Sequence, residues 1–375
     1  MKKRIALLMA SSLLLNATGC KQNSYFEIAY KIVEPTCVSE GYIEHVMNNG
    51  YVYRDNIIEP SQHHYIDFEL KGENPAVYSV CSFCGLLKGY ETGNVEINTD
   101  VCIDRARKKP SFINHDHMVV SMISEKTLES AILKIRLSET HGAHGIMLYL
   151  TALDENYRNI DDLEKIMYCT NLPILVIAYD LPDLLRMGVQ AGACAIDMPG
   201  YLFDDYNSIA SSNKELKNYY SDAGVDVSFV ECDAKEISLK PEIINKQRQF
   251  VDEMHNIGAE VLYSAHTRVE MTSSQIVSAA KFAKNLGVDA VKIVCEGTSK
   301  ETVIEHLKSI RILEQELDIK FSVHGQSTLS RLLGPLFGSY IAYCVDDYVH
   351  DETNIQIDLA TMISILNSPD LADNF

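Results

Sequence analysis

The stretch Thr272–Val294, TSSQIVSAAKFAKNLGVDAVKIV, shows in one place the pattern that repeats along most of the chain. Thr272 and Gln275 have the spacing of a capping box that begins a helix, a glycine follows the helix end, and Ala290–Val294 is a short apolar strand. A helix that leads directly into a buried strand indicates a mixed α/β protein.

The same alternation extends over the C-terminal two thirds of the chain. Predicted strands are Met118–Met122, Gly145–Leu150, Ile174–Ala178, Cys194–Asp197, Val261–Ser264, Ala290–Val294, Lys320–Val323 and Tyr340–Cys344. Predicted helices are Leu128–Thr140, Asp161–Tyr168, Asp183–Ala191, Pro241–Asn256, Ser273–Leu286 and Lys300–Leu317. Eight strands in about 260 residues predict a (β/α)8 TIM barrel over residues 111–375. An open doubly wound sheet is the alternative, but no glycine-rich dinucleotide loop follows the first strand.

One connection is longer than the others. Residues 199–240 separate the fourth and fifth predicted strands, whereas such connections are usually short. We expect this insertion to contain a further strand, Val227–Glu231, and to act as a lid.

Composition restricts the classes of function. The 375 residues are 46% hydrophobic and 23% charged, which is typical of a globular protein. The net charge is −19, from 33 basic and 52 acidic residues, so a nucleic-acid backbone would be repelled. A small anionic substrate in a local basic pocket is compatible with this charge, as is a homo-oligomer.

The first residues have the pattern of an export signal. A basic start, Lys2–Arg4, precedes a short apolar stretch, Ile5–Leu15, and the segment ends in Ala17-Thr18-Gly19-Cys20. This resembles a bacterial lipobox, which predicts a signal peptide at residues 1–19, lipidation of Cys20, and a lipid-anchored protein exported to the cell envelope. The alternative is an ordinary secretion signal in which Cys20 is incidental.

Residues 20–110 are predicted to form a small β module followed by a linker. Alternating runs such as Tyr51-Val52-Tyr53 and Tyr65–Leu70 indicate short antiparallel strands. Cys81 and Cys84 form a CxxC knuckle. A structural zinc site can be completed by Cys37, Cys102, His63 and His64, or the four cysteines can pair as disulfides. An exported location favours oxidation of these cysteines.

Two side chains in the barrel region suggest catalysis. Lys292 is the one charged residue in an apolar strand, where burial should lower its pKa and make it an amine nucleophile. The structural alternative is a lysine at the solvent end of its strand or in an internal ion pair. The preceding strand ends at His266, on the face where barrels place their active sites, although a lone histidine there is more often structural.

These residues carry a family resemblance. Ser264-Ala265-His266, Asp289-Ala290-Val291-Lys292-Ile293 and Ser330-Arg331-Leu332-Leu333-Gly334-Pro335-Leu336-Phe337-Gly338-Ser339 resemble type I 3-dehydroquinate dehydratase in order and separation. The resemblance extends weakly from Met118 to about Leu366. It implies a lyase without a separate cofactor, in which Lys292 forms an imine with a keto acid, His266 moves protons and Arg331 binds the substrate carboxylate. A guanidinium that holds a carboxylate in a bidentate fork agrees with that role.

The substrate-binding residues depart from the family pattern. Met147 and Tyr149 stand where the family has Glu-x-Arg, and the glutamate that assists the histidine has only Asp180 and Asp183 as weak candidates. His324 replaces a methionine before Gly325, and the final loop offers only Thr353 and Gln356. We therefore expect Tyr149, His324 and Gln356 to line a site with altered specificity.

A second hypothesis is a non-catalytic lipoprotein whose barrel mouth holds a sugar acid or another small ligand, because a fold does not guarantee a function. His115-Asp116-His117 could be a metal pair, but such residues at the bottom of a barrel are more often solvated.

Overall fold

The computed structural model describes residues 27–33, 41–49, 51–58, 65–70, 76–81, 88, 101–107, 110–113, 117–346 and 355–368. Contacts divide the chain into two units, Met1–His63 and His64–Phe375. The predicted module of residues 20–110 therefore contributes to both units, and its outer boundaries stay a prediction. The signal segment and Cys20 lie outside the described residues.

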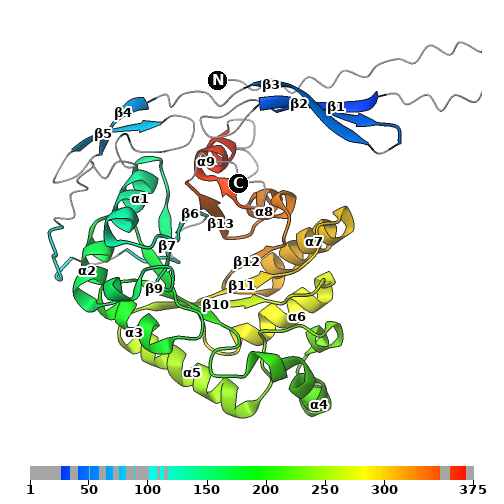
Figure 1. Ribbon diagram of the computed structural model, residues 1–375. Helices are drawn as coiled ribbons and strands as arrows, with labels where there is room; N and C mark the ends of the chain where they lie inside the picture. The colour runs from blue at the N-terminus through cyan, green and yellow to red at the C-terminus, as the bar shows by residue number, and fades with distance from the viewer. Residues whose placement is uncertain are drawn as a thin grey trace, which may run out of the picture. The chain divides into compact units, whose positions relative to one another are not determined.

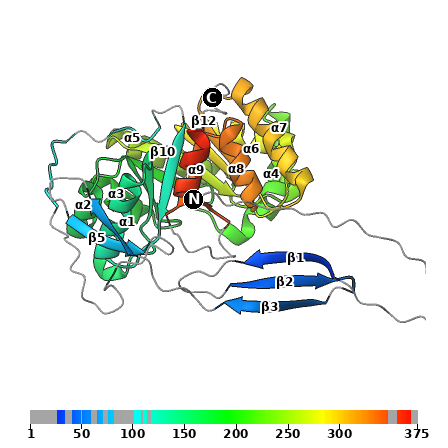
Figure 2. The same ribbon diagram turned by 90° about the horizontal axis from the view of Figure 1, so that it is seen from above.

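The first unit contains a three-stranded antiparallel sheet, seen from above in Figure 2. Its strands are β1 (Glu27–Val33), β2 (Gly41–Met47) and β3 (Val52–Ile58), paired in chain order. The central His45 ring contacts carboxylates on both neighbouring strands, Glu27 and Asp55. These contacts, with Asp55 first, raise the pKa of His45. The imidazole thus links all three strands of the sheet.

The second unit begins with a hairpin, in which β4 (Tyr65–Leu70) pairs antiparallel with β5 (Ala76–Cys81). Its main part is a parallel sheet whose strands alternate with helices, and Figure 1 shows the helices around the outside of the strands. The eight barrel strands are β6 (Met118–Ile123), β7 (Gly145–Tyr149), β8 (Ile174–Ile177), β9 (Ala195–Pro199), β10 (Glu260–His266), β11 (Ala290–Val294), β12 (Lys320–His324) and β13 (Ile341–Val345).

The helices are α1 (Leu128–Thr140), α2 (Ile160–Tyr168), α3 (Pro182–Gln190), α4 (Ile209–Asp222), α5 (Pro241–Asn256), α6 (Ser273–Lys284), α7 (Lys300–Glu316), α8 (Thr328–Leu336) and α9 (Leu359–Leu366). Short 3-10 helices cover Glu155–Tyr157, Tyr206–Ser208 and Ser228–Cys232, and a two-residue strand, β14 (Ile357–Asp358), pairs with the end of β13. No described helix is long and apolar enough to cross a membrane.

Strands β6 to β12 pair in chain order and β13 pairs with β6, which leaves one seam between β12 and β13. The Tyr340 N–H donates to the Phe321 carbonyl at 2.8 Å across this seam. Two serine hydroxyls replace further ladder bonds: Ser322 Oγ accepts from the Ile341 N–H at 3.1 Å, and Ser339 Oγ accepts from the Val323 N–H at 3.0 Å. The predicted (β/α)8 class is therefore confirmed, with a seam held partly by side chains.

The barrel interior changes in character along its axis. Towards the amino ends of the strands, it is filled by an apolar cluster that includes Met118, Met147 and Leu262. The segment before β6 covers this end, where Glu260 accepts from the Phe112 N–H at 2.7 Å and Phe112 accepts from the Tyr340 hydroxyl at 3.0 Å. Towards the carboxyl ends of the strands the interior becomes polar, as in other barrels that place chemistry at this end.

Most predicted elements are confirmed to within two residues, because capping and periodicity agree with the packing. The capping box at Thr272 is present, and Gly258 and Gly287 follow helix ends with φ of 86° each. The predicted strand Val227–Glu231 is wrong. Asp226 Oδ1 accepts from the Ser228 N–H at 2.9 Å, and this local bond begins the 3-10 helix Ser228–Cys232 in place of an extended strand.

Candidate active site

Lys292 lies in the middle of β11 with its side chain inside the barrel, and it is 4% exposed. Its Nζ is 2.5 Å from Oδ2 of Asp197, which is fully buried on β9. Asp197 also accepts a hydrogen bond from the Ser264 hydroxyl on β10, the strand between them. The ammonium is thus held in an internal ion pair, one of the structural alternatives that the sequence left open.

The strand register explains why these groups meet. Ser264 lies opposite Lys292, and Lys292 lies opposite Ser322, so the three share one level of the barrel. Side chains from alternate strands point into a common layer of a barrel, which brings Asp197 of β9 towards Lys292 of β11. The ring of Tyr343 on β13 closes the other side, with its centroid 5.3 Å from Nζ.

His266 ends β10, one level nearer to the carboxyl ends of the strands. It lies opposite Val294, and Val294 lies opposite His324, so the two imidazoles flank β11. Burial, together with the charges of Lys292, Arg268 and Arg331, lowers the pKa of His266 to about 3. The imidazole is therefore neutral at pH 7.

Glu236 is a carboxylate at this level that sequence reasoning missed. It comes from the insertion between β9 and α5, is 4% exposed, and accepts from the His266 backbone N–H at 2.7 Å. Burial raises the pKa of Glu236 to about 7, against the opposing effects of that hydrogen bond and of nearby cations.

Arg331 lies in the first turn of α8, after the N-cap Ser327, and is 8% exposed. Its Nη1 donates to Oε1 of Gln356 at 2.9 Å, while its Nε has no hydrogen-bond partner among the described residues. Burial lowers the pKa of Arg331 to about 10, so the guanidinium stays charged at pH 7. Within the described part of the chain no carboxylate forms an ion pair with it.

His324 is 6% exposed and stands next to this arginine. Neither of its ring nitrogens has a hydrogen-bond partner among the described residues. Burial, followed by the charges of Arg331 and Lys292, lowers the pKa of His324 well below its ordinary value. His324, Arg331 and Tyr343 line a cavity of about 10 Å³, enough for about one water molecule.

A larger pocket of about 350 Å³ is bordered by Gln356, the hydrogen-bond partner of Arg331. Tyr149 and Gln356 line it, together with Glu125, Lys134 and Asp346. Burial raises the pKa of Tyr149 above its ordinary value, and the charges of both Asp197 and Arg331 act on it. Tyr149 therefore lines the pocket and is near enough to both charged groups of the barrel interior for their charges to act on it.

The structure brings together most of the predicted site. Lys292, His266, His324 and Arg331 are close enough for their charges to act on one another, and Tyr149 and Gln356 border the same region. Met147 is buried in the apolar floor, which agrees with its loss of a substrate contact. Asp183 is exposed and pairs with Arg186, so it does not assist His266. Thr353 lies outside the described residues.

The predicted cysteine site stays a prediction, because Cys37 and Cys84 lie outside the described residues. Cys102 is an exposed free thiol, and within the described ranges no group of three His, Cys, Asp or Glu residues could hold a metal. Cys295, directly after β11, is buried in the core outside the barrel interior. His115 and Asp116 also lie outside the described part of the chain.

Asp197 is the other buried charged group of the candidate site that sequence reasoning missed. It was assigned only as the end of a strand, although a single acidic residue in a buried strand was a signal of the same kind as Lys292. Their pairing depends on the strand order of the sheet, in which β9 and β11 both pair with β10.

The type I 3-dehydroquinase family model matches residues 206–372. This segment includes Glu236, His266, Lys292, His324, Arg331 and Gln356 and confirms the predicted resemblance. No curated protein matches the sequence.

Several solved structures are similar. The type I 3-dehydroquinate dehydratase of Clostridium difficile is 17% identical over 68% of this chain and 93% of that chain, with a TM-score of 0.48. The 3-dehydroquinate dehydratase of Geobacillus kaustophilus is 16% identical over 67% and 91%, with a TM-score of 0.45. The N-acetylneuraminic acid synthetase of Leptospira borgpetersenii is 13% identical over 82% and 93%, with a TM-score of 0.41.

Proposed function

Since residues 206–372 resemble the type I 3-dehydroquinases, we propose that this chain is a carbon–oxygen lyase that dehydrates 3-dehydroquinate or a related keto acid through an imine on Lys292. The observation that carries the proposal is a lysine buried inside the barrel, next to a strand that ends in a neutral histidine. A buried amine beside a proton acceptor is what imine chemistry requires.

The proposed reaction begins at the amine. After transfer of the ammonium proton to a base, the Lys292 nitrogen attacks the substrate ketone, and loss of one water gives an imine. Asp197, 2.5 Å from Nζ, is the nearest group that can receive that proton. The imine withdraws electrons from the neighbouring carbon and makes its C–H bond more acidic.

His266 then acts twice. Its neutral imidazole takes the proton from the carbon next to the imine, and it returns a proton to the β-hydroxyl, which leaves as water. Hydrolysis of the conjugated imine consumes one water, releases the product and restores Lys292. The net change in the substrate is the loss of one water.

Arg331 supplies the anion-binding part of the proposed site. A guanidinium buried without an ion pair in the described chain is costly, and a substrate carboxylate would supply the missing charge. The Gln356 oxygen that now accepts from Arg331 would then be replaced by, or joined to, the carboxylate. His324 and Tyr149 would contact the remaining polar groups of the substrate.

The test is to follow formation of the conjugated product from 3-dehydroquinate by ultraviolet absorbance. We expect the full chain to show turnover, the Lys292→Met variant to show none, and the Lys281→Met variant to match the parent. Lys281 is a suitable control because it is half-exposed on α6, where it pairs with Glu316. Turnover that persists in Lys292→Met would overturn the proposed role of the lysine.

The same variant separates this proposal from a non-catalytic binding protein. If the parent shows no turnover and both parent and Lys292→Met bind the keto acid equally well in calorimetry, the barrel mouth acts as a binding site only. Loss of binding in Arg331→Met would place the ligand at the same site in either case.

We also propose that the protein is lipid-anchored in the bacterial cell envelope. The support is the sequence pattern that ends at Cys20, with a basic start, a short apolar stretch and small residues before the cysteine. Metabolic labelling with a radioactive fatty acid should mark the parent chain and leave Cys20→Ser unlabelled. Equal labelling of both would contradict the anchor at Cys20.

A further inference from the structure

We propose that Glu236, which the β9–α5 insertion brings into the barrel mouth, is a positioning residue that holds His266 at the end of β10. The inference rests on the proposed function, because it assigns Glu236 to the proton-transfer part of that site. It gives the insertion a role other than the lid that its length suggested.

The insertion crosses the barrel mouth at a defined point. Directly after β9, the Gly200 N–H donates to the Ser264 carbonyl at 2.7 Å, and Gln247 of α5 donates to the Gly200 carbonyl at 2.8 Å. A Cβ at Gly200 would overlap both the Glu236 carbonyl oxygen and the Tyr263 hydroxyl. Glycine is needed here because the backbone of Glu236 passes directly over it.

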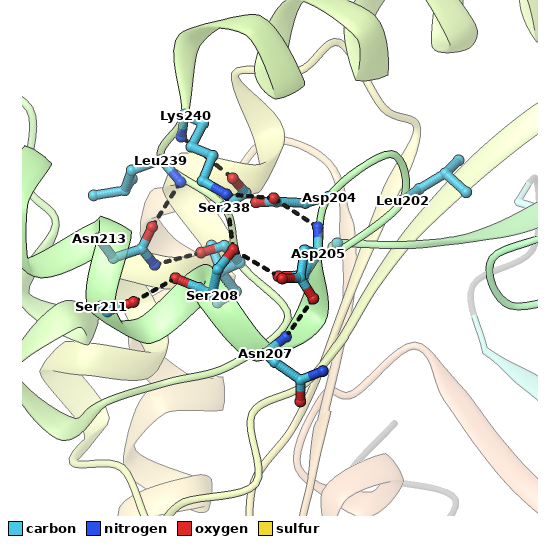
Figure 3. A network of polar contacts seen from close by, with 12 residues as sticks. Leu202, Asp204, Asp205, Asn207, Ser208, Ser211, Asn213, Ser238, Leu239 and Lys240 are labelled. Atoms are coloured by element: carbon cyan, nitrogen blue, oxygen red, sulfur yellow. Dashed lines mark hydrogen bonds and ion pairs between the residues drawn. The ribbon is translucent and has the colours of Figure 1, made fainter.

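A polar network fixes the segment that follows Glu236, as Figure 3 shows. Asn213 of α4 donates to the Ile237 carbonyl at 2.6 Å and accepts from the Leu239 N–H at 2.9 Å. Lys240 then contacts Asp204 at 2.6 Å and the Ser208 hydroxyl at 2.9 Å. Residues 237–240 are therefore held by hydrogen bonds to two other parts of the insertion, α4 and the segment before it.

The residue before Glu236 is also fixed, because the Lys235 N–H donates to the Thr267 carbonyl at 3.1 Å. Glu236 itself has φ of 68°, in the left-handed region that side chains other than glycine rarely adopt. Such a conformation is unfavourable for a side chain with a Cβ and persists only where its surroundings impose it. These restraints direct a strained, buried carboxylate at the histidine strand.

Both oxygens of the Glu236 carboxylate have a neighbour that can donate a hydrogen bond. Oε2 accepts from the His266 N–H at 2.7 Å, and Oε1 is 3.7 Å from Nε of Arg268, which is half-exposed. The titratable and charged groups that act on it are His266, Arg268, Lys292, Asp197, Tyr179, Tyr201 and Tyr263. With its pKa raised to about 7 by burial, Glu236 changes from neutral to charged close to neutral pH.

Ionisation of Glu236 should therefore strengthen its hydrogen bond to the His266 backbone. A carboxylate is a stronger acceptor for the His266 N–H than a neutral carboxyl group is, so His266 is held more firmly above pH 7 than below it. The His266 imidazole does not titrate in this range, because its pKa is lowered to about 3. A rise in activity through pH 7 would then belong to Glu236 and not to the histidine.

The test compares Glu236→Gln with Glu231→Gln. The glutamine at 236 keeps an oxygen for the His266 N–H but removes the charge, whereas Glu231 is an exposed carboxylate of the same insertion, paired with Lys217 at 2.9 Å. The first measurement is the amide NMR signal of His266 between pH 5.5 and 8.5. We expect it to titrate with a midpoint near 7 in the parent and in Glu231→Gln, and not in Glu236→Gln.

The second measurement is the dehydration rate over the same pH range. Glu236→Gln should be about tenfold slower than the parent at pH 8 and nearly equal to it at pH 6, since a charge-assisted hydrogen bond is replaced by a neutral one. An unchanged amide titration or an unchanged rate profile in Glu236→Gln would overturn the inference. If the parent shows no turnover at any pH, the proposed function fails, and the amide titration by itself still decides whether Glu236 holds His266.

Discussion

The two ends of the candidate site differ in how well their charges are paired. At the lysine end, Lys292 pairs with Asp197, which also accepts from Ser264. At the arginine end, Arg331 has a free Nε and only the neutral Gln356 as a partner, and both nitrogens of His324 are unpaired within the described chain. Both ends are more than nine-tenths buried.

This difference indicates separate tasks. A charge that is paired inside the protein is held in place and contributes to folding, whereas a buried donor without a partner costs stability until a ligand supplies the acceptor. We therefore interpret the lysine end as the reacting centre and the arginine end as the part of the site that waits for the anionic group of the substrate.

Replacement of Lys292 should have the largest effect. Lys292→Met should abolish turnover and lower the free energy of unfolding by about 3–5 kcal/mol, because Asp197 is left buried without its partner. Urea denaturation measures the second effect, and the double variant Lys292→Met with Asp197→Asn should recover part of the loss. An unchanged free energy of unfolding in Lys292→Met would show that the pair is not held as described.

Arg331→Met should weaken substrate binding without lowering the stability of the protein. Affinity for the keto acid should fall by about 100-fold or more, because a charged bidentate contact is lost. The free energy of unfolding should not fall, since an unpaired buried guanidinium is removed. Calorimetry and urea denaturation measure the two effects, with the exposed Arg311→Met as a control. A large loss of stability would mean that Arg331 has a structural partner.

Acid should destabilise the protein through its buried imidazoles. The pKa values of His266, His306 and His324 are lowered to about 3, to about 4 and well below the ordinary value. Below pH 6.5 the unfolded chain binds protons that the folded chain does not, so stability falls by about 1.4 kcal/mol per pH unit for each histidine.

Glu236 opposes this trend, because its raised pKa of about 7 lets the folded chain bind a proton between pH 4.5 and 7. The net slope should therefore be that of two histidines, and urea denaturation at pH 6.5, 6 and 5 measures it. His306→Gln should reduce the slope, because it removes one of the three buried imidazoles. A flat profile would contradict the buried, neutral state of these imidazoles.

His324→Met should have the smallest effect. Loss of an imidazole with two unpaired nitrogens should raise the free energy of unfolding by about 1 kcal/mol at pH 7. The dehydration rate should change by less than about tenfold, since we propose that His324 contacts the substrate and takes no part in proton transfer. A complete loss of turnover would move His324 into the proton-transfer part of the site.

The fold could be predicted from the sequence, and so could the burial of Lys292 inside the barrel, for physical reasons. Strand and helix positions follow from local periodicity and capping, and Lys292 was conspicuous because a charge in a buried strand is rare. Asp197 and Glu236 were missed because their roles depend on distant contacts. Asp197 meets Lys292 only once β9 and β11 have both paired with β10. Glu236 meets His266 only because the insertion passes over Gly200 and is held there by its own hydrogen bonds.

The insertion shows the limit of local patterns most clearly. The alternation at Val227–Glu231 indicated a strand, yet Asp226 begins a 3-10 helix there. The helix α4 within the same insertion was not predicted, because its polar sequence has a weak apolar face with only Ile209 and Asn213 buried.

The most direct test of Lys292 as the reacting residue is to trap the proposed imine. The full chain is incubated with 3-dehydroquinate, reduced with borohydride and examined by intact mass and peptide mapping. We predict one substrate-derived adduct per chain, located on Lys292 and absent from the Lys292→Met variant. A turning-over protein without an adduct on Lys292, or an adduct on another lysine, would contradict the assignment of the lysine end as the reacting centre.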